Sequence, residues 1–446
     1  MRPRCRRCNS RLTLNFLGAS NNLAISLGCA IGGRVGAARI SMNPFHPGKG
    51  LRPLYLAGRT RELDQFARLC NANTLAQNAV ILGLRGTGKT VLLEQLKAIA
   101  QANGWLWAGS DLFEYERLTE DSLARRMVIH LSTLLSTALF QHEGQYPPGD
   151  GGVHHEHPLH SENLAKDYDS APGLPGDKLK AVFAKTKALM ERAPLKGIVF
   201  AFDEAQNLCN AALPREAPLS MLVDVFSYFQ RAPSGCRFML VLSGLPTLYQ
   251  SLYECRTYKE STFEVMKLQQ LEPDAAREAI VKPLELSGAT LNFSQNAVDQ
   301  IIVTSDRYPF FIQFICREAF DTWRVKIGEG EIPFISTRDI LHKLDLEFFA
   351  PKWTRATERR QDFMHVIASI ENSDREFSVQ DIVSASQRWL RQGFNASHAT
   401  QILQNLAEKG FVYKNRRAGY CFAIPLLGQF MRRQPWDPSR LRNPGS

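Results

Sequence analysis

Residues 42–270 alternate between two hydrophobic patterns. Largely apolar runs at Asn78–Leu82, Ile198–Phe202 and Phe238–Leu242 have no polar face, which is typical of strands buried on both sides of a parallel sheet. Between them, apolar residues recur at helical spacing, as in Asp121–Phe140. Strands that alternate with helices predict an α/β fold with a parallel sheet and helices on both faces.

The same two patterns predict the other elements of this part. We expect two further strands, at Trp105–Gly109 and Glu264–Leu268. Further helices are expected at Arg59–Leu69, Thr90–Ala100, Leu179–Arg192 and Met221–Phe229. Residues 142–177 are rich in Gly, Pro and His, and we interpret them as a solvent-exposed loop insertion.

Beyond residue 270 the pattern changes twice. Residues 271–350 show helical spacing only, with helices expected at Asp274–Leu286, Ser294–Ser305, Tyr308–Val325 and Ser336–Phe349. Residues 351–435 predict helices at Gln361–Ile370, Val379–Trp389 and Ala396–Lys409, then a hairpin at Phe411–Ile424 that turns at Arg416–Gly419. Three helices and a hairpin indicate a winged helix. The chain thus divides into 42–270, a helical lid at 271–350, a winged helix at 351–435 and a tail at 436–446.

Charge is concentrated in the first 41 residues. The chain has a net charge of +10. Residues 1–41 contribute seven arginines and no acid, so the remaining body carries only +3 (+10 minus +7). The basic pI therefore gives no argument for nucleic-acid binding. We expect residues 1–41 to be disordered or an untranslated leader; Met42 is the favoured start, and Met1 remains the alternative.

Two further observations bear on the compartment. Nine cysteines are dispersed along the chain, an odd number that does not indicate a disulfide framework. No run of 18 apolar residues exists, so no membrane span is expected. We therefore expect a cytoplasmic protein with no membrane partner.

A glycine-rich loop follows the first predicted strand and opens a helix. It reads Gly83, Leu84, Arg85, Gly86, Thr87, Gly88, Lys89 and Thr90, a full match to the Walker A pattern. The glycines let backbone N–H groups turn toward phosphate oxygens, and the helix directs its positive end at them. Lys89 is expected on the β- and γ-phosphates of ATP, and the Thr90 hydroxyl on Mg²⁺. The sheet is therefore predicted to be that of a P-loop NTPase.

A buried strand that ends in two acids gives the second motif. Gly197–Phe202 is followed by Asp203 and Glu204, the Walker B pattern. Asp203 is expected to hold Mg²⁺, and Glu204 to orient and polarise the attacking water. Ser243, at the tip of the next strand, is expected to sense the γ-phosphate; a small residue at a turn is the alternative. These residues predict an ATPase.

These motifs resemble those of AAA+ ATPases of the origin-recognition/initiator-like branch and of the related STAND-type prokaryotic ATPases. The likeness covers about residues 50–435. It begins at Leu56–Leu63, which resembles the "GRxxEL" box near the adenine, and continues through both Walker motifs and Ser243–Pro246. It ends with Arg307–Gln313, which resembles the start of a lid helix, and with Leu403–Arg432, which resembles a terminal winged helix. The resemblance implies a nucleotide-dependent switch, and a homo-oligomer is possible.

The sequence departs from the family at two places. Ser261 stands where an arginine is usually offered to the ATP of a neighbouring subunit, so the resemblance implies slow hydrolysis unless Arg256 or Lys259 substitutes. Arg307 lies beside Asp306, where the family often has glycine. Arg307 is a candidate second sensor of the γ-phosphate, and a solvated surface charge is the alternative.

The target of the switch stays open. Ala396–Lys409 would be the recognition helix of a DNA-binding winged helix, with Arg416 and Arg417 at the wing tip on phosphates. The helix offers few polar residues to read bases, and it carries Glu408. Double-stranded DNA and a protein partner therefore both remain candidates, the latter for a signalling or chaperone-like switch.

Overall fold

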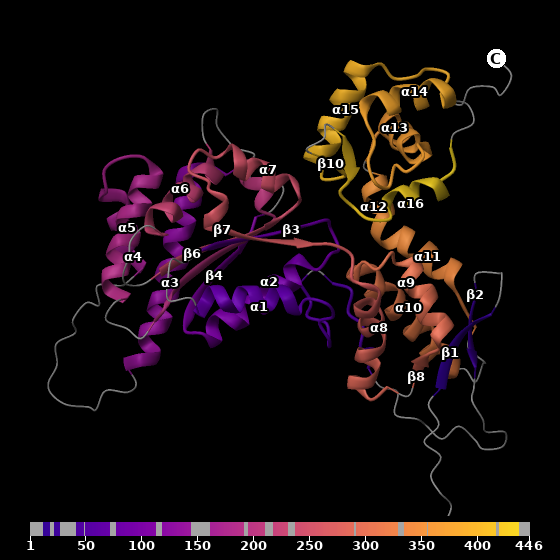
Figure 1. Ribbon diagram of the computed structural model, residues 1–446, viewed down its shortest axis with the longest axis horizontal. Coiled ribbons are helices and arrows are strands. Elements are labelled where there is room, and N and C mark those ends of the chain that lie inside the picture. Colours follow the sequence, from indigo (N-terminus) through magenta and orange to yellow (C-terminus); the bar gives the residue numbers. More distant parts are fainter. Residues whose placement is uncertain are drawn as a thin grey trace, which may run out of the picture. The chain divides into compact units, whose positions relative to one another are not determined.

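A computed structural model divides the chain into two compact units. One comprises residues 1–59, 84–88 and 269–446, and the other comprises residues 60–83 and 89–268. We call them the first and the second unit and describe each by itself (Figure 1). The structure describes residues 12–17, 22–26, 42–48, 50–71, 77–112, 118–143, 161–190, 195–209, 217–230, 237–289, 291–328, 334–354, 356–415 and 419–436.

A five-stranded sheet forms the centre of the second unit. Its strands are β3 (Asn78–Gly83), β4 (Trp105–Asp111), β5 (Gly197–Asp203), β6 (Arg237–Gly244) and β7 (Phe263–Leu268). They lie in the order β4-β5-β6-β3-β7, and every neighbouring pair is parallel. The predicted α/β class and its five strands are confirmed.

Alternate residues of each central strand pack into two different cores. In β5, Ile198, Phe200 and Phe202 join the core of one face. Val199 and Ala201 join the core of the other. Because both faces are apolar, β5 is buried along its whole length.

Helices cover both faces of the sheet (Figure 1). The face of Val199 is covered by α1 (Thr60–Asn71) and α2 (Lys89–Ala102). The face of Phe200 is covered by α3 (Glu120–Glu143), α4 (Ser161–Ser170), α5 (Pro175–Met190), α6 (Pro218–Gln230) and α7 (Thr247–Glu254). None of the helices in the described ranges is both long and apolar enough to span a bilayer.

The helix α4 corrects one expectation. Residues 142–177 were expected to be a loop insertion, but Ser161–Ser170 is helical. Leu164 and Tyr168 are buried against the core of α3 and α5, and this burial stabilises a helix that the surrounding Gly and Pro residues obscure. Residues 144–160 lie outside the described part.

The first unit contains the expected lid helices. They are α8 (Pro273–Ser287), α9 (Gln295–Thr304), α10 (Pro309–Gly328) and α11 (Thr337–Leu344). The helix expected over Ser336–Phe349 is not continuous, since a π-helical turn, η3 (Asp345–Phe349), follows α11. This turn buries Phe349, which stacks on Phe430 of the C-terminal segment at a centroid distance of 4.9 Å.

A small sheet contradicts the expectation that residues 271–350 are helical only. The strands β8 (Leu291–Phe293) and β9 (Phe334–Ser336) flank β1 (Leu12–Leu17) and β2 (Asn22–Ser26) in the order β8-β1-β2-β9. The expectation of disorder over 1–41 therefore does not hold for β1 and β2. Apolar and polar residues alternate along Leu12–Phe16 in the sequence, a period of two that is typical of strands. The rest of 1–41 lies outside the described residues.

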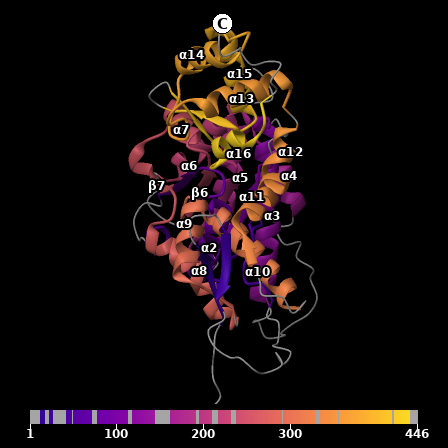
Figure 2. The same ribbon diagram turned by 90° about the vertical axis from the view of Figure 1, so that its right-hand side faces the viewer.

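The C-terminal segment is built of short helices around one hairpin. It begins with α12 (Ala350–Trp353), which directly follows η3. The elements after it are α13 (Glu358–Ser369), α14 (Val379–Trp389), α15 (Ala396–Glu408), β10 (Val412–Lys414), β11 (Tyr420–Phe422) and α16 (Leu427–Arg433). The strands β10 and β11 pair antiparallel. The helices α13, α14 and α15 gather together in both views (Figure 2). Arg416 and Arg417 lie outside the described residues.

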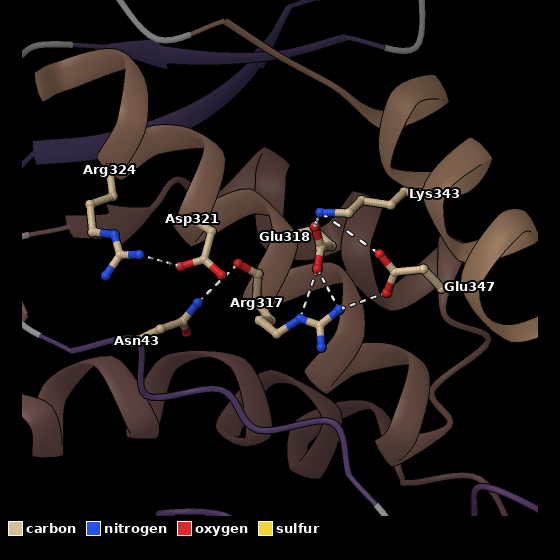
Figure 3. Close-up of polar contacts among 7 residues, drawn as sticks. All are labelled: Asn43, Arg317, Glu318, Asp321, Arg324, Lys343 and Glu347. Carbon is tan, nitrogen blue, oxygen red and sulfur yellow. Dashed lines mark hydrogen bonds and ion pairs between the residues drawn. The ribbon is translucent and has the colours of Figure 1, made fainter. Parts of the chain in front are cut away.

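A buried carboxylate joins α10 to the helix that follows it (Figure 3). Glu318 of α10 is 4% exposed, and it pairs with Arg317 at 2.5 Å and with Lys343 of α11 at 2.5 Å. Glu347 of η3 approaches the same two cations, at 3.2 and 3.9 Å. Asn43 of the segment before α1 donates to the backbone carbonyl of Arg317 at 3.0 Å. The network thus ties three separate stretches of the first unit together.

Candidate nucleotide site

In the second unit, three predicted site residues converge on one carboxylate. Asp203 ends β5 and is 1% exposed. The Thr90 hydroxyl donates to its Oδ2 at 2.6 Å, and the Ser243 hydroxyl of β6 donates to its Oδ1 at 2.8 Å. The parallel strands β5 and β6 end at the same edge, which brings Asp203 and Ser243 side by side. Sequence spacing alone had not paired them.

Lys89 is held close to the strand that precedes its loop. It begins α2 and is 6% exposed. Its Nζ donates to the carbonyl oxygen of Gly83, the last residue of β3, at 3.0 Å. A lysine ammonium at this point, beside the N-terminus of a helix, places positive charge where an anion would bind.

Glu204 joins the group around Asp203 through its backbone and not through its side chain. Its backbone is left-handed, with φ of 54°, and its N–H donates to Asp203 Oδ1 at 3.0 Å. Its carboxylate instead accepts a hydrogen bond of 2.6 Å from Gln206 Nε2. Gln206 lies in the 3-10 turn η1 (Ala205–Cys209), and the sequence analysis did not single it out. No sequence motif identifies this glutamine, because its hydrogen-bond partners come from different parts of the chain.

In the first unit, residues Leu84–Gly88 are held through their backbone. The Arg59 guanidinium, 6% exposed, donates to the carbonyls of Thr87 at 3.1 Å and of Gln269 at 2.9 Å. Gly86 has φ of 82°, a conformation that favours glycine. A Cβ there would also lie 3.3 Å from Cβ of Phe310. Arg59, from the "GRxxEL" box, therefore fixes the glycine-rich loop.

Two further contacts tie this loop to later parts of the first unit. The Arg85 N–H donates to the carbonyl of Ala423 at 3.1 Å, just after β11. The Phe310 N–H of α10 donates to the carbonyl of Gly86 at 3.2 Å. Leu84 packs against the C-terminal core. The loop thus contacts both the lid helices and the C-terminal segment.

Arg307 precedes α10 in a strained turn. Asp306 and Arg307 both have left-handed backbone, with φ of 46° and 59°, which explains why glycine suits these positions. Gln270 donates to the Asp306 carboxylate at 2.8 Å and accepts from Arg307 Nη2 at 3.5 Å. Burial raises the pKa of Asp306, and the bond from Gln270 opposes this. The role of Arg307 as a sensor stays a prediction.

Comparison with known proteins gives matches over most of the chain. Residues 55–244 match the AAA ATPase domain family, and residues 346–431 match a family described as a domain of unknown function. No curated protein sequence matches the chain. The Walker-type ATPase of Pyrococcus abyssi is similar in structure with a TM-score of 0.56 and 17% identity, over 88% of this chain and 99% of that one.

A second solved structure shares the fold. It is the ORC2 protein of Aeropyrum pernix, solved as ADPNP–ADP complexes. Its TM-score is 0.50 at 14% identity, with 86% of this chain and 94% of that one covered. At such identities the likeness establishes a common fold.

Proposed function

We propose that the chain is a nucleotide-dependent switch that binds and slowly hydrolyses ATP, because residues 55–244 match the AAA ATPase domain family and the chain shares the fold of the ORC2 protein. The resemblance to AAA+ ATPases is confirmed by the family match, and the relation to STAND-type ATPases stays a prediction. ORC2 was solved with ADPNP and ADP, which supports the choice of an adenine nucleotide.

The donors around Asp203 suit a magnesium ion. A nearly buried carboxylate and a hydroxyl 2.6 Å apart are hard oxygen ligands, and neutral groups alone donate to Asp203 in the described ranges. Thr90 and Asp203 would hold Mg²⁺, which would neutralise charge on the β- and γ-phosphates. Lys89 would bind the same phosphates, and Ser243 would hold Asp203 in place.

Hydrolysis needs a base beside the attacking water. We assign that role to Glu204, which is partly exposed and next to Asp203. The water oxygen forms a bond to the γ-phosphorus while the bond from that phosphorus to the β–γ bridging oxygen breaks. Glu204 accepts the proton of the water, and ADP and phosphate leave.

One observation carries the proposal of a switch. The backbone of the glycine-rich loop is bonded to Ala423 of the C-terminal segment and to Phe310 of the lid helix α10. A triphosphate that orders Leu84–Gly88 would therefore alter contacts of both, which is how a ligand shifts a conformational equilibrium. Backbone amide exchange of residues 412–423, measured with and without Mg-ATP, would change if this coupling operates.

The ATPase proposal is tested with three proteins. Wild type should bind a fluorescent ATP analogue saturably and release phosphate only with Mg²⁺. Lys89→Ala should lose binding, whereas Glu204→Gln should bind normally and lose hydrolysis by about a hundredfold or more. Absence of saturable binding by the wild type would overturn the proposal. Normal phosphate release by Glu204→Gln would overturn the assignment of Glu204.

We further propose that the C-terminal segment is a winged helix that contacts double-stranded DNA. Its helix order and the β10–β11 hairpin support this, and Gln401 and Gln404 of α15 and Lys409, which caps its C-terminus, are exposed. The alternative is a protein partner, which the weak charge of the body and exposed Glu408 favour. Gel shifts with duplex DNA at low salt, in the presence and absence of ATP, separate the two: no shift in either state excludes the DNA target.

A further inference from the structure

Both acids at the end of β5 are tied to the end of β6, but by different residues. Ser243 reaches Asp203 directly at 2.8 Å. Glu204 is reached through Gln206, whose Nε2 donates to Glu204 Oε2 at 2.6 Å and whose Oε1 accepts from the Leu245 N–H at 3.0 Å. Leu245 follows β6 directly, two residues after Ser243. The amide of Gln206 is therefore a bridge between Glu204 and the strand that carries Ser243.

The orientation of this amide is fixed by its partners. A backbone N–H can only donate, so the oxygen of the Gln206 amide must face Leu245. The NH₂ group then faces Glu204, whose carboxylate can only accept. Each end of the amide has the partner that its polarity requires. A glutamine with the opposite orientation would lose both bonds.

The backbone at the end of β6 packs closely against the Gln206 side chain. A Cβ on Gly244 would lie 2.6 Å from Gln206 Oε1 and 3.3 Å from the Gln206 backbone nitrogen. Glu204 has a left-handed φ of 54°, which is strained for a residue other than glycine, and its carbonyl accepts from the Asn207 N–H at 3.0 Å. Strain of this kind persists where neighbouring contacts hold it, and Gln206 supplies the contact to the side chain.

We propose that Gln206 is the positioning residue of the ATPase reaction, which holds the Glu204 carboxylate and couples it to the end of β6. This inference rests on the proposed function. The hydrogen bond from Gln206 to Glu204 Oε2 holds the carboxylate in one orientation, which a base for the attacking water requires. Any displacement of Ser243–Leu245 when nucleotide binds is passed through the amide to Glu204. Gln206 thus acts through Glu204, as a positioning residue does.

Two variants of matched size test the bridge. Gln206→Met keeps the length of the side chain and removes both hydrogen bonds. It should lower kcat about tenfold to a hundredfold at every pH, with KM and affinity for a fluorescent ATP analogue unchanged. Gln206→Glu keeps the acceptor for Leu245 but opposes Glu204 with a second carboxylate. Because like charges repel, its kcat should fall at least as far as that of Gln206→Met, again with KM unchanged.

The outcomes separate the inference from the function on which it rests. A wild type that neither binds nor hydrolyses ATP removes the function and the inference together. A wild type that hydrolyses ATP, beside a Gln206→Met variant with kcat within twofold of it, overturns the inference alone. A Gln206→Glu variant with a kcat close to that of wild type shows that the hydrogen bond to Glu204 is not needed, and this also overturns the inference. Nucleotide binding by each variant establishes that it is folded.

Discussion

At the scale of single residues, Asp203 shows how neutral donors surround a buried carboxylate. Its carboxylate accepts from the hydroxyls of Thr90 and Ser243 and from the N–H of Glu204. Such neutral donors compensate only part of the cost of removing an ionised group from water. A cation should therefore bind more strongly beside this buried carboxylate than beside a solvated aspartate. Ser243 contributes to this arrangement through Asp203, in addition to any role in sensing phosphate.

His365 gives a prediction for the pH dependence of stability. It lies in α13, 5% exposed, between the rings of Trp353 and Trp436 at 5.1 and 4.9 Å. Burial lowers its pKa from 6.5 to about 4. The unfolded chain therefore takes up a proton at a pH where the folded chain does not, so stability is complete above about pH 6.5 and falls as the pH decreases toward 4. Between pH 7 and 5 the loss should be about 2 kcal/mol.

The matched measurement uses His365→Gln, which cannot take up this proton. Urea unfolding at several pH values, followed for wild type and variant, cancels the contribution of carboxylates that both proteins share. The wild type should lose about 2 kcal/mol more than the variant on going from pH 7 to 5. Parallel pH profiles would mean that His365 is not the group responsible.

At the scale of elements, the carboxylate network of Figure 3 sets the contact of α10 with α11. Glu318 is almost fully buried, whereas the side chains of Arg317 and Lys343 are 29% and 53% exposed. Removing the acid therefore leaves solvated cations, while removing both cations leaves a buried charge. We expect Glu318→Gln to cost about 1 kcal/mol and the double variant Arg317→Met with Lys343→Met about 3–5 kcal/mol. Chemical denaturation measures both, and equal costs would contradict this account.

The elements that sequence predicted best are those with strong local patterns. β5 and β6 were found because Ile198–Phe202 and Phe238–Leu242 are apolar throughout, and α15 because Ala399, Leu403 and Leu406 recur at helical spacing. β8 and β9 were missed because three residues carry no measurable periodicity, and their partners β1 and β2 are distant in sequence. α4 was missed because its stability comes from packing.

The same division holds for the candidate site. The glycine-rich loop, Asp203 and Glu204 form contiguous motifs, so their proposed roles could be predicted from sequence. Gln206 could not, since its role depends on the Leu245 N–H, which the sheet brings to it. Arg59 was placed near the adenine by resemblance, yet its guanidinium bonds the carbonyl of Thr87. Contacts made by backbone groups depend little on residue type, so they could not be predicted from the sequence.

At the scale of the whole molecule, the question is whether one copy completes the active site. Ser261 lies exposed in η2 (Glu260–Thr262), and its carbonyl accepts from Gln77 at 2.9 Å. A serine hydroxyl carries no charge with which to stabilise a transferring phosphoryl group in a neighbouring copy. An arginine in that role is worth about 10³–10⁵ in rate, so its absence predicts slow hydrolysis.

It follows that the ATPase rate per molecule should not depend on protein concentration, even if copies associate. We expect phosphate release per molecule to stay constant over about a hundredfold range of concentration, while the mass in solution is followed in parallel. Ser261→Arg should raise the rate only at concentrations where a homo-oligomer forms. A wild-type rate that climbs with concentration, and that falls in Arg256→Ala or Lys259→Ala, would instead assign the missing charge to one of those exposed residues.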